Sequence, residues 1–175
     1  MIALRLALTI GALLAATPAL AERLVFDHRL APPLKAVLDS KNAAMIEYND
    51  KNPRYVVDVI AIRGKSAKDW TEALVIVART PGKKVRTAAE WMAELRAEAE
   101  ARRCTSQLRT LAEDANSITF ERRSTGCRGD YPPVALYRVV SGERSLFLLA
   151  VMAKDDLSEQ SLREWLAMLG SARLE

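Results

Sequence analysis

The chain has 175 residues, of which 27% are charged, and its formal net charge is +4 at pH 7. The lysines and arginines are interleaved with acidic residues and do not form the basic stripe that is typical of nucleic-acid-binding proteins, so nucleic acid is not an expected partner. The length suits a single domain.

The first 21 residues have the three parts of a secretory signal peptide. Arg5 supplies the positive start, residues 6–16 are apolar, and Ala19-Leu20-Ala21 is a small-x-small cleavage site. We expect cleavage after Ala21, a single α+β domain over residues 22–175, and a periplasmic or secreted location. The alternative is a retained membrane anchor, which Pro18 disfavours because a membrane span needs about 20 apolar residues.

The first half of the exported part is rich in predicted strands. Short strands are expected at residues 23–26 and 44–48, with one or two helical turns at residues 34–38 between them. Residues 55–62 predict a longer strand, in which the polar Asp58 indicates one partly wet face.

The densest β-branched, apolar run is residues 74–78, which lies between Trp70-Thr71-Glu72 and Pro81-Gly82. A run this short with turn residues on both sides predicts a strand buried on both faces. Residues 63–66 are expected to turn the chain, which would make this strand the antiparallel neighbour of the one before it.

Two amphipathic helices are predicted. Thr87 and Glu90 form a capping-box pattern that opens a helix from residue 88 to about residue 103. Its core-facing residues are spaced as a helix requires and comprise Trp91, Met92, Leu95 and Ala99. A last helix opens near residues 156–159, ends at Gly170, and places on one face Leu162, Trp165, Leu166 and Leu169.

Two hairpins complete the predicted elements. One pairs residues 107–112 with residues 117–122, although its first arm could instead be the tail of a helix. The other pairs residues 134–140 with residues 145–151 around a turn that contains Gly142. Because strands cluster in neighbouring pairs, the fold class is expected to be α+β, with an antiparallel sheet of about six strands covered by helices.

Cys104 and Cys127 are the only cysteines. Two cysteines in an oxidising compartment predict a disulfide. The alternative is a nucleophilic thiol with His28, the only histidine, as its base. A catalytic triad, a zinc site or a haem site normally needs more ligands than one histidine, so no catalytic residue, cofactor or metal ligand is predicted.

Five arginines flank the two cysteines in sequence. If the disulfide forms, they gather at one end of the domain as a possible binding patch for an anionic lipid head group, a polyanion or an acidic partner. The alternative is solvated surface charge, partly neutralised by neighbouring acidic residues. The five are Arg102, Arg103, Arg122, Arg123 and Arg128.

The signal peptide, the strand that opens with Trp70-Thr71-Glu72, the helix after Pro81, and the spaced cysteines resemble a group of uncharacterised exported proteins of Gram-negative bacteria. These look like the PsbP-like fold, an antiparallel sheet flanked by helices. Members of that fold class mostly act as binding or assembly-accessory proteins, so the resemblance implies binding more than catalysis and transfers no catalytic residue.

The sequence therefore predicts a non-catalytic periplasmic binding or accessory protein, with an envelope protein or an anionic surface component as its partner. A thiol- or histidine-dependent envelope hydrolase is the first alternative. The second is a small-molecule carrier with an apolar pocket between sheet and helices.

Overall fold

The computed structural model describes residues 22–49, 51, 55–102, 104–127 and 131–175, so the predicted signal peptide lies outside the described residues. The strands are β1 (Leu24–Val25), β2 (Ile46–Asn49), β3 (Tyr55–Ser66), β4 (Asp69–Arg79), β5 (Thr105–Glu113), β6 (Ser117–Thr125), β7 (Val134–Ser141), β8 (Leu146–Ala153) and β9 (Arg173–Leu174). The helices are α1 (Pro32–Ser40), α2 (Ala88–Ala101) and α3 (Glu159–Gly170), with short 3-10 turns η1 (His28–Leu30) and η2 (Ala43–Met45).

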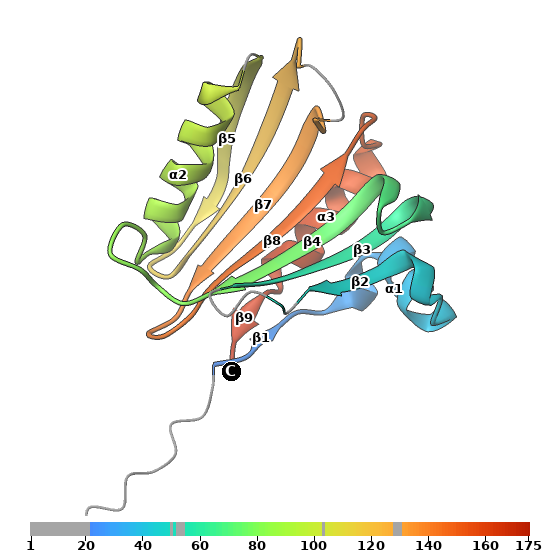
Figure 1. Cartoon of the computed structure of the whole chain (residues 1–175), viewed down its shortest axis with the longest axis horizontal. Coiled ribbons are helices and arrows are strands. Elements are labelled where there is room, and N and C mark those ends of the chain that lie inside the picture. Colours follow the sequence, from blue (N-terminus) through green and yellow to red (C-terminus); the bar gives the residue numbers. More distant parts are fainter. Residues whose placement is uncertain (1–21, 50, 52–54, 103, 128–130) are drawn as a thin grey trace, which may run out of the picture.

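Seven of the described strands form one large antiparallel sheet in the order β2-β3-β4-β8-β7-β6-β5 (Figure 1). The expected α+β class with an antiparallel sheet is confirmed, but the prediction of about six strands was too low, because this sheet has seven. Both predicted hairpins are present, as β5–β6 and β7–β8. Residues 107–112 belong to strand β5, which excludes the helix-tail alternative.

The two ends of the described chain meet in a second, two-stranded sheet of β1 and β9 (Figure 1). Arg23 and Glu175 exchange backbone hydrogen bonds of 2.9 Å in both directions. Just before β1, the Glu22 carboxylate accepts hydrogen bonds from the backbone N–H groups of Glu143 and Arg144 in the β7–β8 turn. Gly142 makes this approach possible, because a Cβ atom at that position would collide with the Glu22 carboxylate.

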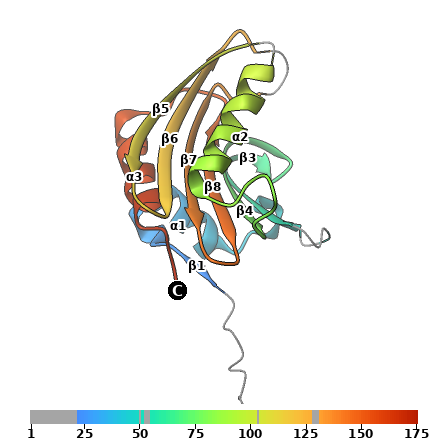
Figure 2. The same ribbon diagram turned by 90° about the vertical axis from the view of Figure 1, so that its left-hand side faces the viewer.

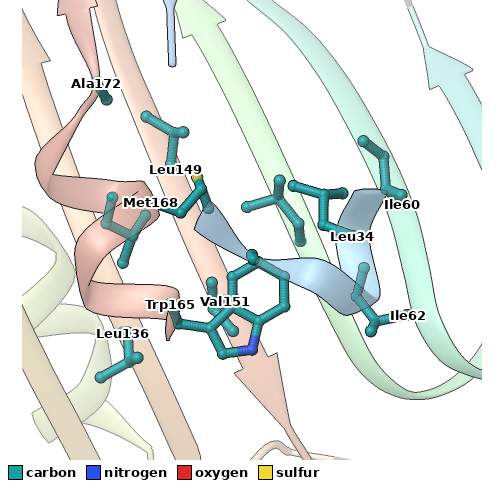
Figure 3. Packing of buried hydrophobic residues seen from close by; sticks show 12 residues of the cluster. Leu34, Ile60, Ile62, Leu136, Leu149, Val151, Trp165, Met168 and Ala172 are labelled. Atoms are coloured by element: carbon teal, nitrogen blue, oxygen red, sulfur yellow. The ribbon is translucent and has the colours of Figure 1, made fainter. Parts of the chain in front are cut away.

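Helices lie on both faces of the large sheet, as the two perpendicular views show (Figures 1 and 2). On one side, here called the α3 face, α1 and α3 cover the sheet. Its fully buried side chains include Leu34, Leu74, Leu136, Val151 and Trp165, and Figure 3 shows Trp165 beside Val151. Burial of a large apolar side chain of this kind stabilises the fold by about 1.5–3 kcal/mol.

The opposite side, here called the α2 face, has a separate core. Trp91 of α2 belongs to it with Phe120 and Tyr137, whose rings stack with centroids 4.7 Å apart. Helix α2 contacts β5, β6 and β7, so it lies over one half of the sheet. Successive residues of the central strands β4, β7 and β8 alternate between the two cores, as the period of a strand requires.

Strand β4 is longer and less buried than predicted. It begins at Asp69, and therefore extends beyond the apolar run 74–78 to include Trp70-Thr71-Glu72. Leu74 is fully buried, but residues 75–78 are only half-buried. On the α2 face, the burial of these residues is incomplete because α2 packs over β5–β7 and leaves β4 at the edge of the covered area. The predicted burial of this run on both faces was wrong for those residues.

The β3–β4 turn also lies further along the chain than residues 63–66, because β3 continues to Ser66. The pairing of the two strands is irregular near Gly64, which has a φ of +122°. A side chain there would collide with the backbone oxygen of Asp69. Glycine is therefore required at this irregularity for both conformational and steric reasons.

The predicted capping box is confirmed. Glu90 N–H donates to the Thr87 hydroxyl, and the Glu90 carboxylate accepts from the Thr87 N–H at 2.9 Å. Helix α2 ends at Ala101, slightly before the predicted end. Helix α3 begins at Glu159, where Ser158 is the N-cap and accepts from the N–H of Ser161.

Candidate functional site

The two cysteines form the predicted disulfide. Cys104 lies just after α2 and Cys127 lies just after β6, with their Cα atoms 4.5 Å apart. Both cysteines of the chain are in this bond, so neither is a free thiol. On the chain-entropy model a loop of this size gives a stabilisation of about 3 kcal/mol.

Arg122, a member of the predicted arginine patch, is buried and only 2% exposed. Its guanidinium donates to the Tyr137 hydroxyl at 3.1 Å, to the Ser124 hydroxyl at 2.7 Å and to the backbone oxygen of Pro132 at 2.9 Å. It also lies 4.2 Å from the ring centroid of Tyr131. These neutral oxygens and the aromatic face hold the charge inside the α2 face.

Arg102 lies 4.4 Å from the same Tyr131 ring, so this ring contacts two guanidinium groups. Burial raises the pKa of the neighbouring Tyr137 hydroxyl, although the Arg122 charge opposes this shift. Tyr137 therefore stays neutral in ordinary buffers and accepts the hydrogen bond from Arg122.

The five arginines of the predicted patch do not form one surface. Arg122 is buried on the α2 face, whereas Arg123, the next residue of β6, points to the α3 face and pairs with Glu121. The separation follows from strand geometry, since adjacent residues point to opposite sides of a sheet. Arg103 and Arg128 lie outside the described residues.

Arg123 belongs instead to a row of residues that crosses the α3 face. Register pairs connect six neighbouring strands from β3 to β5 through the residues Arg63, Glu72, Ala153, Val134, Arg123 and Gln107. Polar and charged residues stand at both ends of this row, and small apolar residues stand in its middle. The row lies near the first turn of α3. Residues of that turn help to line one hollow at each end of the row.

The first hollow, here called the acidic hollow, has a volume of about 140 Å³. Three carboxylates and one guanidinium line it, and the carboxylates belong to Glu72, Asp155 and Asp156 while the guanidinium belongs to Arg63. Its hydroxyl groups come from Thr71, Ser158 and Ser161. Glu72 is 5% exposed. Its Oε1 accepts from the indole N–H of Trp165 at 2.7 Å, and its Oε2 lies 3.3 Å from Arg63.

The second hollow, here called the arginine hollow, is lined by Gln107, Arg109, Glu121, Arg123 and Leu162. Glu121 is buried, and one oxygen of its carboxylate accepts from Arg109 at 2.9 Å while the other accepts from Arg123 at 2.8 Å. Both guanidinium groups remain substantially exposed. Two guanidinium groups and one carboxylate line this hollow, so it has one excess positive charge.

The pair of Arg123 and Asp156, 3.2 Å apart, connects the two hollows. We call the two hollows and this connecting ion pair the charged groove. Its opposite ends carry opposite excess charge, and each end contains a buried carboxylate that neighbouring groups hold in one position.

The sequence analysis missed Glu72 and Glu121 as members of a site. Glu72 lies just before the apolar run 74–78 and Glu121 lies inside the predicted strand 117–122, and neither position alone indicates a site. A signal was present in part, because alternation within the predicted strand 117–122 places Glu121 and Arg123 on the same side and Arg122 on the other.

His28 lies in η1, which packs against α1 and α3, whereas the disulfide lies between the end of α2 and the end of β6. Next to His28 in the sequence, a hydrogen bond from the Arg29 guanidinium lowers the pKa of Asp27 to about 2. In the described part of the chain, histidine, cysteine and acidic side chains do not gather in threes that could hold a metal ion. None of the described helices is long and apolar enough to cross a membrane.

No protein-family model matches this chain, and no curated protein matches it in sequence.

Proposed function

We propose that this protein is an exported, disulfide-linked binding domain that engages an envelope protein or an anionic surface component through its charged groove. The observation that carries the proposal is the groove itself, where Glu72 and Glu121 are buried and fixed beside exposed charged groups. Fixed charged groups at a surface favour recognition because they need little reorganisation when a partner binds.

The disulfide between Cys104 and Cys127 supports the export part of the proposal, since such bonds persist in oxidising compartments. The seven-stranded antiparallel sheet, with α1 and α3 on one face and α2 on the other, supports the proposed resemblance to the PsbP-like fold. That resemblance in turn favours a binding or accessory role.

The alternative functions have less support. A thiol-dependent hydrolase needs a free cysteine, and both cysteines are oxidised in this structure. A carrier of apolar small molecules needs an apolar pocket, whereas the acidic hollow is lined mainly by charged and hydroxyl groups.

The test is expression of the full chain, with its predicted signal, in a bacterial host, followed by intact and native mass spectrometry. We expect a mass that begins at Glu22 and lacks two hydrogens, and a bound envelope component in the native spectrum. A matched variant, Arg109→Gln with Asp155→Asn, should bind less of that component. An uncleaved chain with reduced cysteines would contradict export, and equal retention by the variant would contradict binding through the groove.

A further inference from the structure

We infer that the charged groove binds an extended peptide segment that carries one basic and one acidic side chain four residues apart. The inference rests on the binding function proposed above and specifies the chemical class of the ligand.

The polarity of the groove defines the two side chains. The acidic hollow has three carboxylates against one guanidinium, which favours a basic side chain. Asp155 has no ion-pair partner among the residues that the structure describes, so its charge is available to a ligand. The arginine hollow has two guanidinium groups against one carboxylate, which favours an acidic side chain.

The exposed arginine of the second hollow has donors to spare. Arg109 forms one hydrogen bond, through Nη2 to Glu121, and its side chain is 69% exposed. A guanidinium has five N–H donors, so Arg109 can donate to a ligand carboxylate without releasing Glu121.

The sheet sets the length of the ligand. Glu72 and Arg123 share one register row, and they are separated by three strand-to-strand steps through β8 and β7. Three steps of about 4.8 Å give roughly 14 Å between their backbones. A free amino acid is too short to reach both hollows, whereas four residues of extended chain cover about 13 Å.

The size of the acidic hollow agrees with this ligand. A volume of about 140 Å³ is below that of a typical small-molecule site, which is about 300–1,000 Å³. It has room for the end of one lysine or arginine side chain. The rest of the peptide would lie over the exposed Arg123–Asp156 pair.

The test is a calorimetric titration of the purified, oxidised protein at low salt with two capped peptides of equal composition. The spaced peptide is acetyl-Gly-Lys-Ala-Ala-Ala-Glu-Gly-amide, and the control is acetyl-Gly-Ala-Lys-Glu-Ala-Ala-Gly-amide. We expect the spaced peptide to bind about fivefold more tightly, since only it can place one charge in each hollow. In a parallel NMR titration, it should shift the Trp165 indole resonance, because that N–H donates to Glu72.

Two exposed substitutions test the placement. Asp155→Asn and Arg109→Gln should each weaken binding of the spaced peptide by about two- to fivefold, the size expected for one solvent-exposed ion pair. Asp39→Asn on α1 and Arg163→Gln on α3 are matched controls outside the groove lining and should leave the affinity unchanged.

Equal affinity for the two peptides, no detectable binding at millimolar peptide, or unchanged affinity in both groove variants would overturn the inference. The titration uses purified protein and does not depend on export. A failed titration together with an envelope component in the native spectrum would therefore reject this ligand class and leave the proposed function standing. An uncleaved, reduced chain that still binds the spaced peptide would reject the proposed export and leave this ligand class standing.

Discussion

The indole Nε1–H of Trp165 donates a 2.7 Å hydrogen bond to Oε1 of Glu72, which joins α3 to β4 across 93 residues of sequence. Both side chains are buried, so the bond satisfies the polar atom of a core tryptophan and also fixes the carboxylate of the acidic hollow. One contact therefore connects the packing of the α3 face with the geometry of the charged groove.

Removal of this acceptor should destabilise the fold. We expect Glu72→Ala to lower the free energy of unfolding by about 1–3 kcal/mol, because the Trp165 N–H is left buried without a partner. Glu72→Gln keeps an acceptor oxygen and should cost less. Urea unfolding monitored by circular dichroism measures both values. A loss below about 0.5 kcal/mol in Glu72→Ala would contradict the assigned role of this bond.

Arg122 and Arg123 form a matched pair of adjacent arginines on opposite sides of β6. Arg122→Ala should lower the free energy of unfolding by about 2 kcal/mol or more, because Tyr137, Ser124 and Pro132 lose a buried donor. Arg123→Ala should cost less than about 1 kcal/mol, since its side chain is 47% exposed.

Urea titrations of these two variants compare the two environments directly. Equal losses would contradict the separation of the two arginines onto a buried and an exposed side. Arg122→Lys is a further control, which keeps the charge but cannot reproduce the three hydrogen bonds of the guanidinium.

Reduction of the disulfide should destabilise the domain by about 3 kcal/mol, because the unfolded chain regains the freedom of the loop between Cys104 and Cys127. Urea unfolding with and without dithiothreitol measures this difference. A double variant, Cys104→Ser with Cys127→Ser, should match the reduced protein and should not respond to the reductant. An unfolding midpoint that reductant leaves unchanged in the native protein would contradict the prediction.

Stability should fall as the pH is lowered from about 5 towards 2. Hydrogen bonds from Arg29 lower the pKa of Asp27 from 3.8 to about 2. Arg23 lowers the pKa of Glu175, and the Ser117 hydroxyl lowers the pKa of Asp114. In the folded protein these carboxyl groups hold their protons less tightly than in the unfolded chain. Their stabilising contribution is therefore complete above their ordinary pKa values and is lost as the pH falls through the folded values.

Glu22 allows this pH dependence to be tested at one residue. Burial opposes its ionisation, but the N–H groups of Glu143 and Arg144 outweigh that effect and lower its pKa. Urea midpoints measured between pH 5 and pH 2 should therefore fall less steeply in Glu22→Gln than in the native protein. Parallel curves for the two proteins would show that this carboxylate is not linked to folding.

Local patterns predicted most of the fold. The alternation and turn residues around Gly142 sufficed for the β7–β8 hairpin, and the Thr87–Glu90 pair sufficed for the start of α2, because both depend on residues close in sequence. Strand β9 was not predicted, because two residues carry no periodic signal and the strand exists only through its pairing with β1.

The charged groove was less predictable, because its parts come from distant segments. Glu72 becomes buried only when Trp165 supplies a donor, and no local pattern indicates that contact. The arginine patch illustrates a different limit. Grouping Arg122 with Arg123 by sequence distance ignored the alternation of the strand that holds them, although that strand was itself predicted.

The pairing of β1 with β9 brings the two ends of the domain together, since Arg23 and Glu175 are hydrogen-bonded neighbours. A short linker between residue 175 and residue 22 could therefore join the two ends, and a circular permutant could open the chain at an exposed turn instead. Conversely, a truncation at either end removes the partner of the other. A fusion or affinity tag attached after Glu175 would therefore stand beside Arg23.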